Sequence, residues 1–141
     1  MRKRVLYDTN VLLDVILLRT PHVTASAAAL DLAAEGTVEG FVAGHAVTTI
    51  AYLVQREKGQ ATARKALVQL LSRIRVAPTT DSAVRLALAL GLSDFEDAVS
   101  VASAQEAGCD VIVTRNLPHC RSALVKAILP EALVTAERDA P

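Results

Sequence analysis

The sequence has few aromatic residues, few cysteines, no net charge and no long apolar run. Only two phenylalanines and two tyrosines occur among 141 residues, and tryptophan is absent. A core must therefore come from Leu, Val, Ile and Ala, a set that suits helices packed on a parallel sheet. With aromatic side chains so scarce, recognition of single-stranded nucleic acid by base stacking has little support.

Charge and cysteine content narrow the class of protein further. Fifteen basic and fifteen acidic residues give a formal net charge of zero, so any site for a polyanion must be local. Cys109 and Cys120 lack the spacing of a zinc site or a disulfide framework, which favours a reducing cytosol. Neither a membrane-spanning run nor the apolar core of a signal peptide occurs; we therefore expect a cytoplasmic protein without membrane contact.

Short β-rich segments alternate with longer stretches that carry Ala and Leu at helical spacing. The segments are 5–9, 40–43, 74–77 and 111–114, with a weaker fifth at 132–136. Helices that cross between short apolar strands require a mostly parallel sheet covered on both faces, and the length suits one domain. We predict a single domain over residues 1–141: a three-layer α/β/α sandwich with a central, mostly parallel sheet of four to five strands.

Asp8 stands at the end of the first predicted strand, within "YDTNVLLD". In an open parallel α/β sheet, ligands bind where the carboxyl ends of strands meet the following helices. Asp8 is therefore a candidate binding residue. Thr9 and Asn10 can cap the helix that follows, and a plain capping cluster explains "DTN" equally well. Asp14, six residues further on, need not share the role of Asp8.

A second acidic cluster is "SDFEDA", residues 93–98. Ser93 and Glu96 match a capping box, whereas Asp94 and Asp97 share a helix face. The small and apolar residues that follow Asp97 at helical spacing predict that it faces inward, which is costly unless it is paired or bound to metal. A divalent cation between Asp97 and Asp8 satisfies both carboxylates, and hard oxygen ligands favour Mg²⁺ or Mn²⁺ over zinc.

The stretch "DVIVTRN" at 110–116 is a third strand end with polar residues. Thr114 and Asn116 lie beside Asp8 if the chain returns to the centre of the sheet, and either can bind a metal or its water. A plain strand-exit turn is the better-supported alternative from this stretch alone. Arg115 would then stand beside the pocket, where it can contact a phosphate.

Three motifs together resemble the PIN domain family, which includes the VapC-type toxins of toxin–antitoxin pairs. They are "YDTNVLLD", "DFEDAVSVASAQEAGCDVIVTRN" and "ILPEALV", in the family's order and over essentially the whole chain. The resemblance implies an Mg²⁺- or Mn²⁺-dependent endoribonuclease that hydrolyses RNA phosphodiesters with a cognate antitoxin as partner. By the same resemblance Asp8 and Asp97 are catalytic, Asp94 joins them as a metal ligand, and Asn10 supports Asp8.

Two positions depart from the family pattern. The family usually has a Glu in the helix after the second strand, where this chain has Thr48 and Thr49, and an Asp after "TRN", where it has His119 followed by Cys120. Thr49 can still support a bound water, together with Thr114 and Asn116. A lone loop histidine such as His119 more often faces solvent, so it is not counted as catalytic.

Several readings remain open at this point. The departures motivate an alternative, a weakened or inactive PIN-like domain that binds RNA or protein. A dehalogenase-like phosphatase needs a second Asp two residues after the first, where this chain has Asn10. Apolar helices such as "VLLDVILL" suggest a face buried in a homodimer.

Overall fold

The computed structural model describes residues 1–139. Five parallel strands form one sheet in the order β3-β2-β1-β4-β5. The strands are β1 (Arg4–Tyr7), β2 (Glu39–Ala43), β3 (Arg75–Ala77), β4 (Val111–Val113) and β5 (Lys126–Ile128). The helices are α1 (Thr9–Ile16), α2 (Val23–Ala34), α3 (Gly44–Lys58), α4 (Gln60–Leu71), α5 (Asp81–Leu90), α6 (Phe95–Glu106), α7 (Leu117–Cys120) and α8 (Pro130–Arg138).

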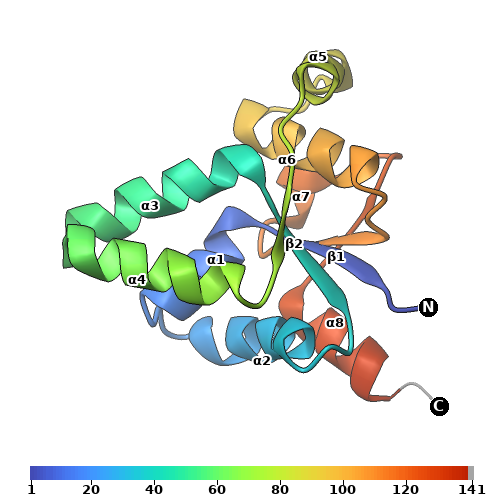
Figure 1. Ribbon diagram of the computed structural model, residues 1–141. Coiled ribbons are helices and arrows are strands. Elements are labelled where there is room, and N and C mark those ends of the chain that lie inside the picture. The colour runs from blue at the N-terminus through green and yellow to red at the C-terminus, as the bar shows by residue number, and fades with distance from the viewer. Residues whose placement is uncertain (140–141) are drawn as a thin grey trace.

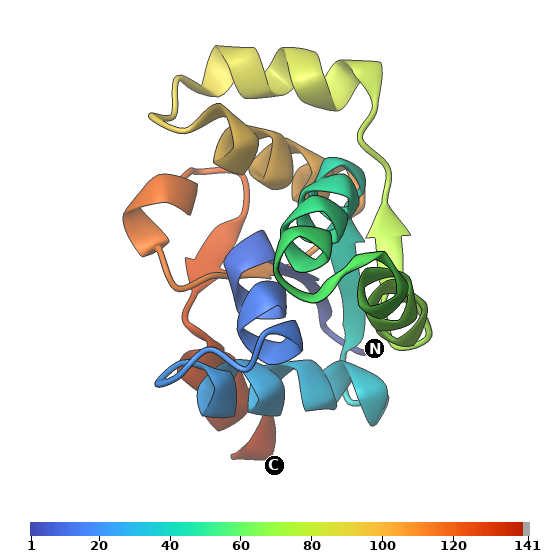
Figure 2. The ribbon, with the colours of Figure 1, turned by 90° about the vertical axis from the view of Figure 1, so that its left-hand side faces the viewer.

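Helices cover both faces of the sheet. Helices α2 and α8 pack together on one side of the strands, and α5 and α6 lie on the other (Figure 1). Helices α3 and α4 form an antiparallel pair beside them, which the turned view shows next to α1 (Figure 2). The predicted three-layer α/β/α fold with a central parallel sheet is confirmed.

The core is aliphatic because the three central strands, β2, β1 and β4, are buried on both faces. Leu6, Val42 and Ile112 are fully or almost fully buried, as expected for central strands of a parallel sheet. Tyr7 is the largest buried side chain, and its hydroxyl donates to the carbonyl oxygen of Ala29 at 2.8 Å. At Gly40 a Cβ atom would lie 2.6 Å from Cγ2 of Ile74, so only glycine lets β2 pack this closely.

The fifth strand is not where the sequence predicted it. Residues 132–136 belong to helix α8, which begins at Pro130, and the strand is β5 at Lys126–Ile128, paired with β4. Proline suits the first turn of a helix because a backbone N–H group there has no hydrogen-bond partner within the helix. The helical position is also favoured by packing, since Leu133 is completely buried and α8 packs on α2. Strand β5 gave no clear signal because it is three residues long and begins with an exposed lysine.

The chain reverses its direction across the sheet between β1 and β4. From β1 it proceeds outward to β2 and β3, and it then crosses back to β4 on the other side of β1. The carboxyl ends of β1 and β4 therefore lie side by side, with Tyr7 opposite Val113. Such a switch in strand order is the usual ligand-binding place of an open parallel sheet. In residues 1–139 there is no helix long and apolar enough to cross a membrane.

Candidate metal centre

Asp8 occupies the switch point at the end of β1. Its backbone N–H donates to the carbonyl oxygen of Val113 at 2.9 Å, and its side chain accepts a 3.0 Å hydrogen bond from the hydroxyl of Thr114. Asp8 is only 4% exposed and Thr114 is completely buried. Asp8 is also the N-cap of α1 by backbone geometry, but no side-chain hydrogen bond caps this helix. The capping explanation of "DTN" is therefore wrong, and the Asp8 carboxylate remains available to a ligand.

Asp94 and Asp97 reach the same place from the first turn of α6. The cap of this helix is Asp94, whose Oδ1 accepts the backbone N–H of Asp97 at 3.0 Å. The expected capping box of Ser93 and Glu96 is wrong, because the helix begins one residue later than that motif requires. The cap fixes the direction of Asp94 relative to Asp97. The partial positive charge at the helix N-terminus also favours the carboxylates there.

These carboxylates line one pocket of about 340 Å³. It lies at the carboxyl end of the sheet and is walled by α1, α3, α6 and the segment after β4. Its lining residues are Asp8, Thr9, Asn10, Leu13, Thr49, Leu53, Asp94, Glu96, Asp97, Asn116 and His119. Four of them are acidic, so the pocket is strongly negative although the chain as a whole is neutral.

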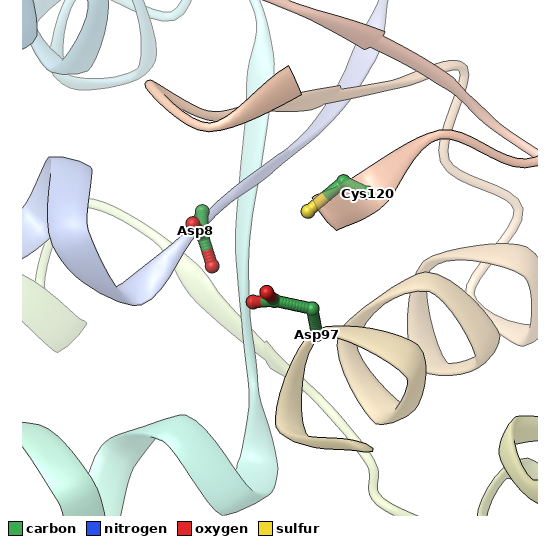
Figure 3. A group of neighbouring side chains, drawn as sticks. All are labelled: Asp8, Asp97 and Cys120. Atoms are coloured by element: carbon green, nitrogen blue, oxygen red, sulfur yellow. The ribbon is translucent and has the colours of Figure 1, made fainter. Parts of the chain in front are cut away.

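The carboxylates oppose one another's ionisation. Figure 3 shows the side chains of Asp8 and Asp97 pointing toward each other from β1 and α6. Burial, followed by the charges of Asp8 and Asp94, raises the pKa of Asp97 to about 6. Burial also raises the pKa of Asp8, against the hydrogen bond from Thr114. The folded chain thus holds acids that favour either a proton or a cation at this place.

His119 and Cys120 adjoin the carboxylates from helix α7. The Nδ1 atom of His119 lies 3.3 Å from Oδ2 of Asp97 and 2.8 Å from the side-chain nitrogen of Asn116. Cys120 is completely buried, and its sulfur is turned toward the two aspartates (Figure 3). Burial raises the pKa of the Cys120 thiol to about 12, so it is neutral at neutral pH.

The structure brings together all the residues that the sequence selected. Thr114 contacts Asp8 directly, whereas Asn10, Thr49 and Asn116 line the pocket. Thr48 does not line it, since its hydroxyl turns back to the carbonyl oxygen of His45.

Two ionisable residues of the pocket, Glu96 and His119, were not among those predicted from the sequence. Glu96 was explained as part of a capping box, although it lines the pocket with the aspartates. His119 was expected to face solvent, but it lies against Asp97 and its side chain is 44% exposed. The sequence did hold a signal for His119, because it occupies the position at which the family pattern has an acid.

Arg115 does not stand free beside the pocket as the sequence suggested. Its guanidinium donates to both carboxylate oxygens of Asp14, from Nε at 2.7 Å and from Nη2 at 3.1 Å. Asp14 is completely buried and also accepts a hydrogen bond from Ser26 at 3.0 Å. This network ties the segment after β4 to α1 and α2. Asp14 therefore has a partner of its own and is not one of the pocket acids.

The donor set fits a divalent cation. Ligand atoms of Asp94, Asp97 and His119 lie within 4.8 Å of one another, and so do those of Asp8, Asp97 and Cys120. The buried hydroxyl of Thr9, also on the pocket wall, has no hydrogen-bond partner among the described residues. Carboxylate and hydroxyl oxygens are ligands that hard cations prefer. The pocket can hold such an ion without a change of fold.

Comparison with known proteins identifies the family of the chain. The fold is similar to that of VapBC2 from Rickettsia felis, solved bound to a DNA fragment from its promoter, with a TM-score of 0.71 and 16% identity over 89% of this chain and 98% of that one. It is also similar to VapC20 of Mycobacterium tuberculosis, a toxin that cleaves the sarcin–ricin loop, with a TM-score of 0.68 and 17% identity over 86% and 97% of the two chains. A search of curated proteins finds no match. A family model described as the PIN domain matches residues 4–118, and the chain therefore belongs to the PIN domain family.

Proposed function

We propose that this protein is a divalent-cation-dependent endoribonuclease that hydrolyses RNA phosphodiesters. The observation that carries the proposal is Asp8, which is 4% exposed, faces Asp97, and has no lysine or arginine within ion-pair distance in residues 1–139. A buried carboxylate without such a partner is costly, and a cation resolves that cost. Membership of the PIN domain family and the fold shared with a toxin that cleaves RNA support RNA as the substrate.

The role of each pocket residue in this proposal follows from its position. Asp8, Asp94 and Asp97 hold Mg²⁺ or Mn²⁺, which supplies Lewis-acid stabilisation of negative charge on a phosphoryl group and lowers the pKa of water. Thr114 fixes the direction of the Asp8 carboxylate through its hydrogen bond. Asn10, Thr49 and Asn116 offer polar atoms to solvent and phosphate from the pocket wall. Attack by water, in line with the family resemblance, leaves a 5'-phosphate.

The proposed biological setting is a toxin–antitoxin pair. The fold is shared with VapBC2 from Rickettsia felis, which was solved bound to a DNA fragment from its promoter, and this supports an antitoxin protein as partner of the present chain. The homodimer expected from the apolar helices stays a prediction.

The first test is cleavage of RNA by the purified protein. We expect cleavage with Mn²⁺ or Mg²⁺, its loss on chelation, and products with 5'-phosphate ends. The same cations should raise the melting temperature, because a ligand that binds only the folded state stabilises it, by about 2.7 kcal/mol at a hundred times its Kd. Equal cleavage with and without chelator contradicts the proposal.

A second candidate function rests on the two departures from the family pattern. Thr49 and His119 stand where the family has acids, which lowers the negative charge available to hold cations. The alternative is a PIN-like domain that binds RNA or protein without cleaving it. Cation binding without cleavage of any RNA would favour this alternative over the ribonuclease.

Both exposed aromatic side chains belong to residues that neighbour pocket residues in the sequence. Of the four aromatic residues, Tyr7 and Phe41 are buried, whereas Tyr52 and Phe95 are 63% and 48% exposed. Phe95 stands between two pocket residues of α6, and Tyr52 lies one turn after Thr49 on α3. Arg56 lies with its guanidinium 5.7 Å from the centre of the Tyr52 ring. Their number argued against stacking, but their exposure and their place in the chain beside pocket residues support stacking of unpaired RNA bases near the pocket.

We expect Tyr52→Ala and Phe95→Ala to weaken RNA binding. Loss of a stacked base costs about 1–3 kcal/mol, or roughly 5-fold to 150-fold in affinity. The effect should appear in KM for single-stranded RNA, with kcat much less affected, since neither side chain is one of the proposed ligands. Val68→Ala on α4 is the matched control, because Val68 is 71% exposed and does not line the pocket. An equal loss with all three variants argues against stacking.

A further inference from the structure

We propose that His119 is a ligand of the cation beside Asp8, Asp94 and Asp97, and that its nitrogen makes the site prefer Mn²⁺ to Mg²⁺. The inference rests on the proposed function, because it concerns the cation held by the same carboxylates. It goes further by naming a nitrogen ligand and a choice of metal.

The geometry of His119 is that of a ligand. Its Nδ1 atom lies 3.3 Å from Oδ2 of Asp97, and one ring nitrogen of His119 lies within 4.8 Å of a carboxylate oxygen of Asp94 and of one of Asp97. A cation with ligands at about 2.0–2.3 Å separates them by roughly 3–4.5 Å, so only small side-chain shifts are needed. In the cation-free protein the side-chain nitrogen of Asn116 contacts Nδ1 of His119 at 2.8 Å and holds the ring next to the pocket; a bound cation would take the place of this contact.

A second observation also points to a ligand in this pocket. Thr9 is 8% exposed and lines the pocket, and its buried hydroxyl oxygen has no hydrogen-bond partner in residues 1–139. Buried hydroxyl groups are normally satisfied. A rotation of the Thr9 side chain toward the pocket would give this hydroxyl a water of a hydrated cation as its partner.

The preference for Mn²⁺ follows from the ligand types. Mg²⁺ prefers oxygen ligands in near-ideal octahedral geometry, whereas imidazole suits transition metals. Where the family pattern has a carboxylate, His119 supplies a neutral nitrogen, so the site holds the cation with one negative charge fewer. One negative charge fewer weakens the binding of both Mn²⁺ and Mg²⁺. A bond to the His119 nitrogen restores more of the binding free energy for Mn²⁺ than for Mg²⁺.

Cys120 is the competing ligand. Its sulfur lies within 4.8 Å of carboxylate oxygens of both Asp8 and Asp97. However, Cys120 is completely buried and does not line the pocket, whereas His119 does. A cation that enters through the pocket therefore meets the imidazole and the carboxylates that line it. This places the nitrogen, not the sulfur, in the coordination shell.

The test is pulsed electron paramagnetic resonance of Mn²⁺ bound to the full chain. We expect modulation from one imidazole nitrogen in the native protein and its disappearance in His119→Asp, which still binds Mn²⁺. The ratio of Mn²⁺ to Mg²⁺ affinity, measured by competition, should fall by roughly tenfold, the scale seen when a group that supports a metal is replaced. His119→Gln tests the loss of nitrogen without an added charge, and His45→Gln is the matched control that keeps the signal.

The outcomes separate the two proposals. Mn²⁺ bound without nitrogen modulation, or with modulation that persists in His119→Asp, overturns the role of His119 and leaves the cation site in place. No binding of Mn²⁺ at all overturns both. With Co²⁺ as probe, a sulfur-to-metal charge-transfer band would assign the ligand to Cys120 and overturn the present assignment, whereas its absence supports His119.

Discussion

Asp8→Asn and Asp97→Asn are each expected to reduce RNA cleavage by roughly a hundredfold or more, the scale on which loss of one preorganised electrostatic group acts. Asparagine keeps the size of the side chain but removes the charge that attracts a cation. Asp8 and Asp97 face each other at the centre of the site, so neither can replace the other. The measurement is kcat on a defined RNA, with saturating Mn²⁺ and Mg²⁺ in separate series.

The matched control is Asp31→Asn, an exposed aspartate on α2 outside the pocket. It should leave cleavage unchanged. Nearly native cleavage by both pocket variants would show that these residues do not hold the reacting groups. Loss of cleavage in Asp31→Asn as well would point to a general effect on the fold.

The same two substitutions should make the cation-free protein more stable at neutral pH. The pKa of Asp97 is raised to about 6 by burial and by its acidic neighbours, and burial also raises that of Asp8. An acid whose pKa is raised in the folded state holds its proton more tightly there, so it lowers stability as pH rises from about 4 through 6. Melting temperatures in chelator should therefore fall over this range in the native protein and less in Asp97→Asn. An unchanged slope in Asp97→Asn would contradict this explanation.

The order of elements was largely predictable because the short apolar segments at 5–9, 40–43 and 111–114 are buried on both sides, and 74–77 ends in the buried Ala77 although Val76 is exposed. Burial on both faces gives a continuous apolar run that ends in polar residues, as at Asp8 and Thr114. Strand β5 lies at the edge of the sheet, and its three residues begin with Lys126. Its pairing with β4 depends on tertiary contacts that a three-residue pattern does not encode.

The pocket acids were found from chain positions at which a charge interrupts an apolar pattern. Asp8 ends a strand, and Asp97 begins an apolar helix face; the parallel sheet then brings them together. Glu96 and His119 were missed because each has an ordinary local explanation, a capping box and a loop histidine. Only the start of α6 at Phe95 and the contact of His119 with Asp97 exclude those explanations.

The buried pair of Asp14 and Arg115 explains why the chain carries a second aspartate so close to Asp8. Asp14 is completely buried, while 28% of the Arg115 side chain is exposed. Arg115 follows Thr114, which orients Asp8, and precedes Asn116, which contacts His119. The pair therefore anchors the segment that carries two neighbours of the proposed cation, so a structural ion pair supports the geometry of the site.

We expect Arg115→Ala to destabilise the protein by about 3–5 kcal/mol, because it leaves the charge of Asp14 buried without a partner. This is a large fraction of the roughly 5–15 kcal/mol that stabilises a typical domain. Asp14→Ala should cost less, since Arg115 is partly exposed and can turn to water. Urea denaturation measures both, and the double variant Asp14→Leu with Arg115→Met should recover much of the loss, because it leaves no unpaired charge.

The exposed pair of Asp81 and Arg85 on α5 is the matched control. Their side chains are 80% and 77% exposed at a distance of 2.9 Å, so Arg85→Ala should cost less than about 1 kcal/mol. If Arg115→Ala costs no more than Arg85→Ala and instead raises KM for RNA, Arg115 acts as a phosphate contact, as the sequence alone suggested. A large loss of stability, with the double variant recovering it, assigns Arg115 to the support of the pocket, because only a buried partner makes its charge indispensable to the fold.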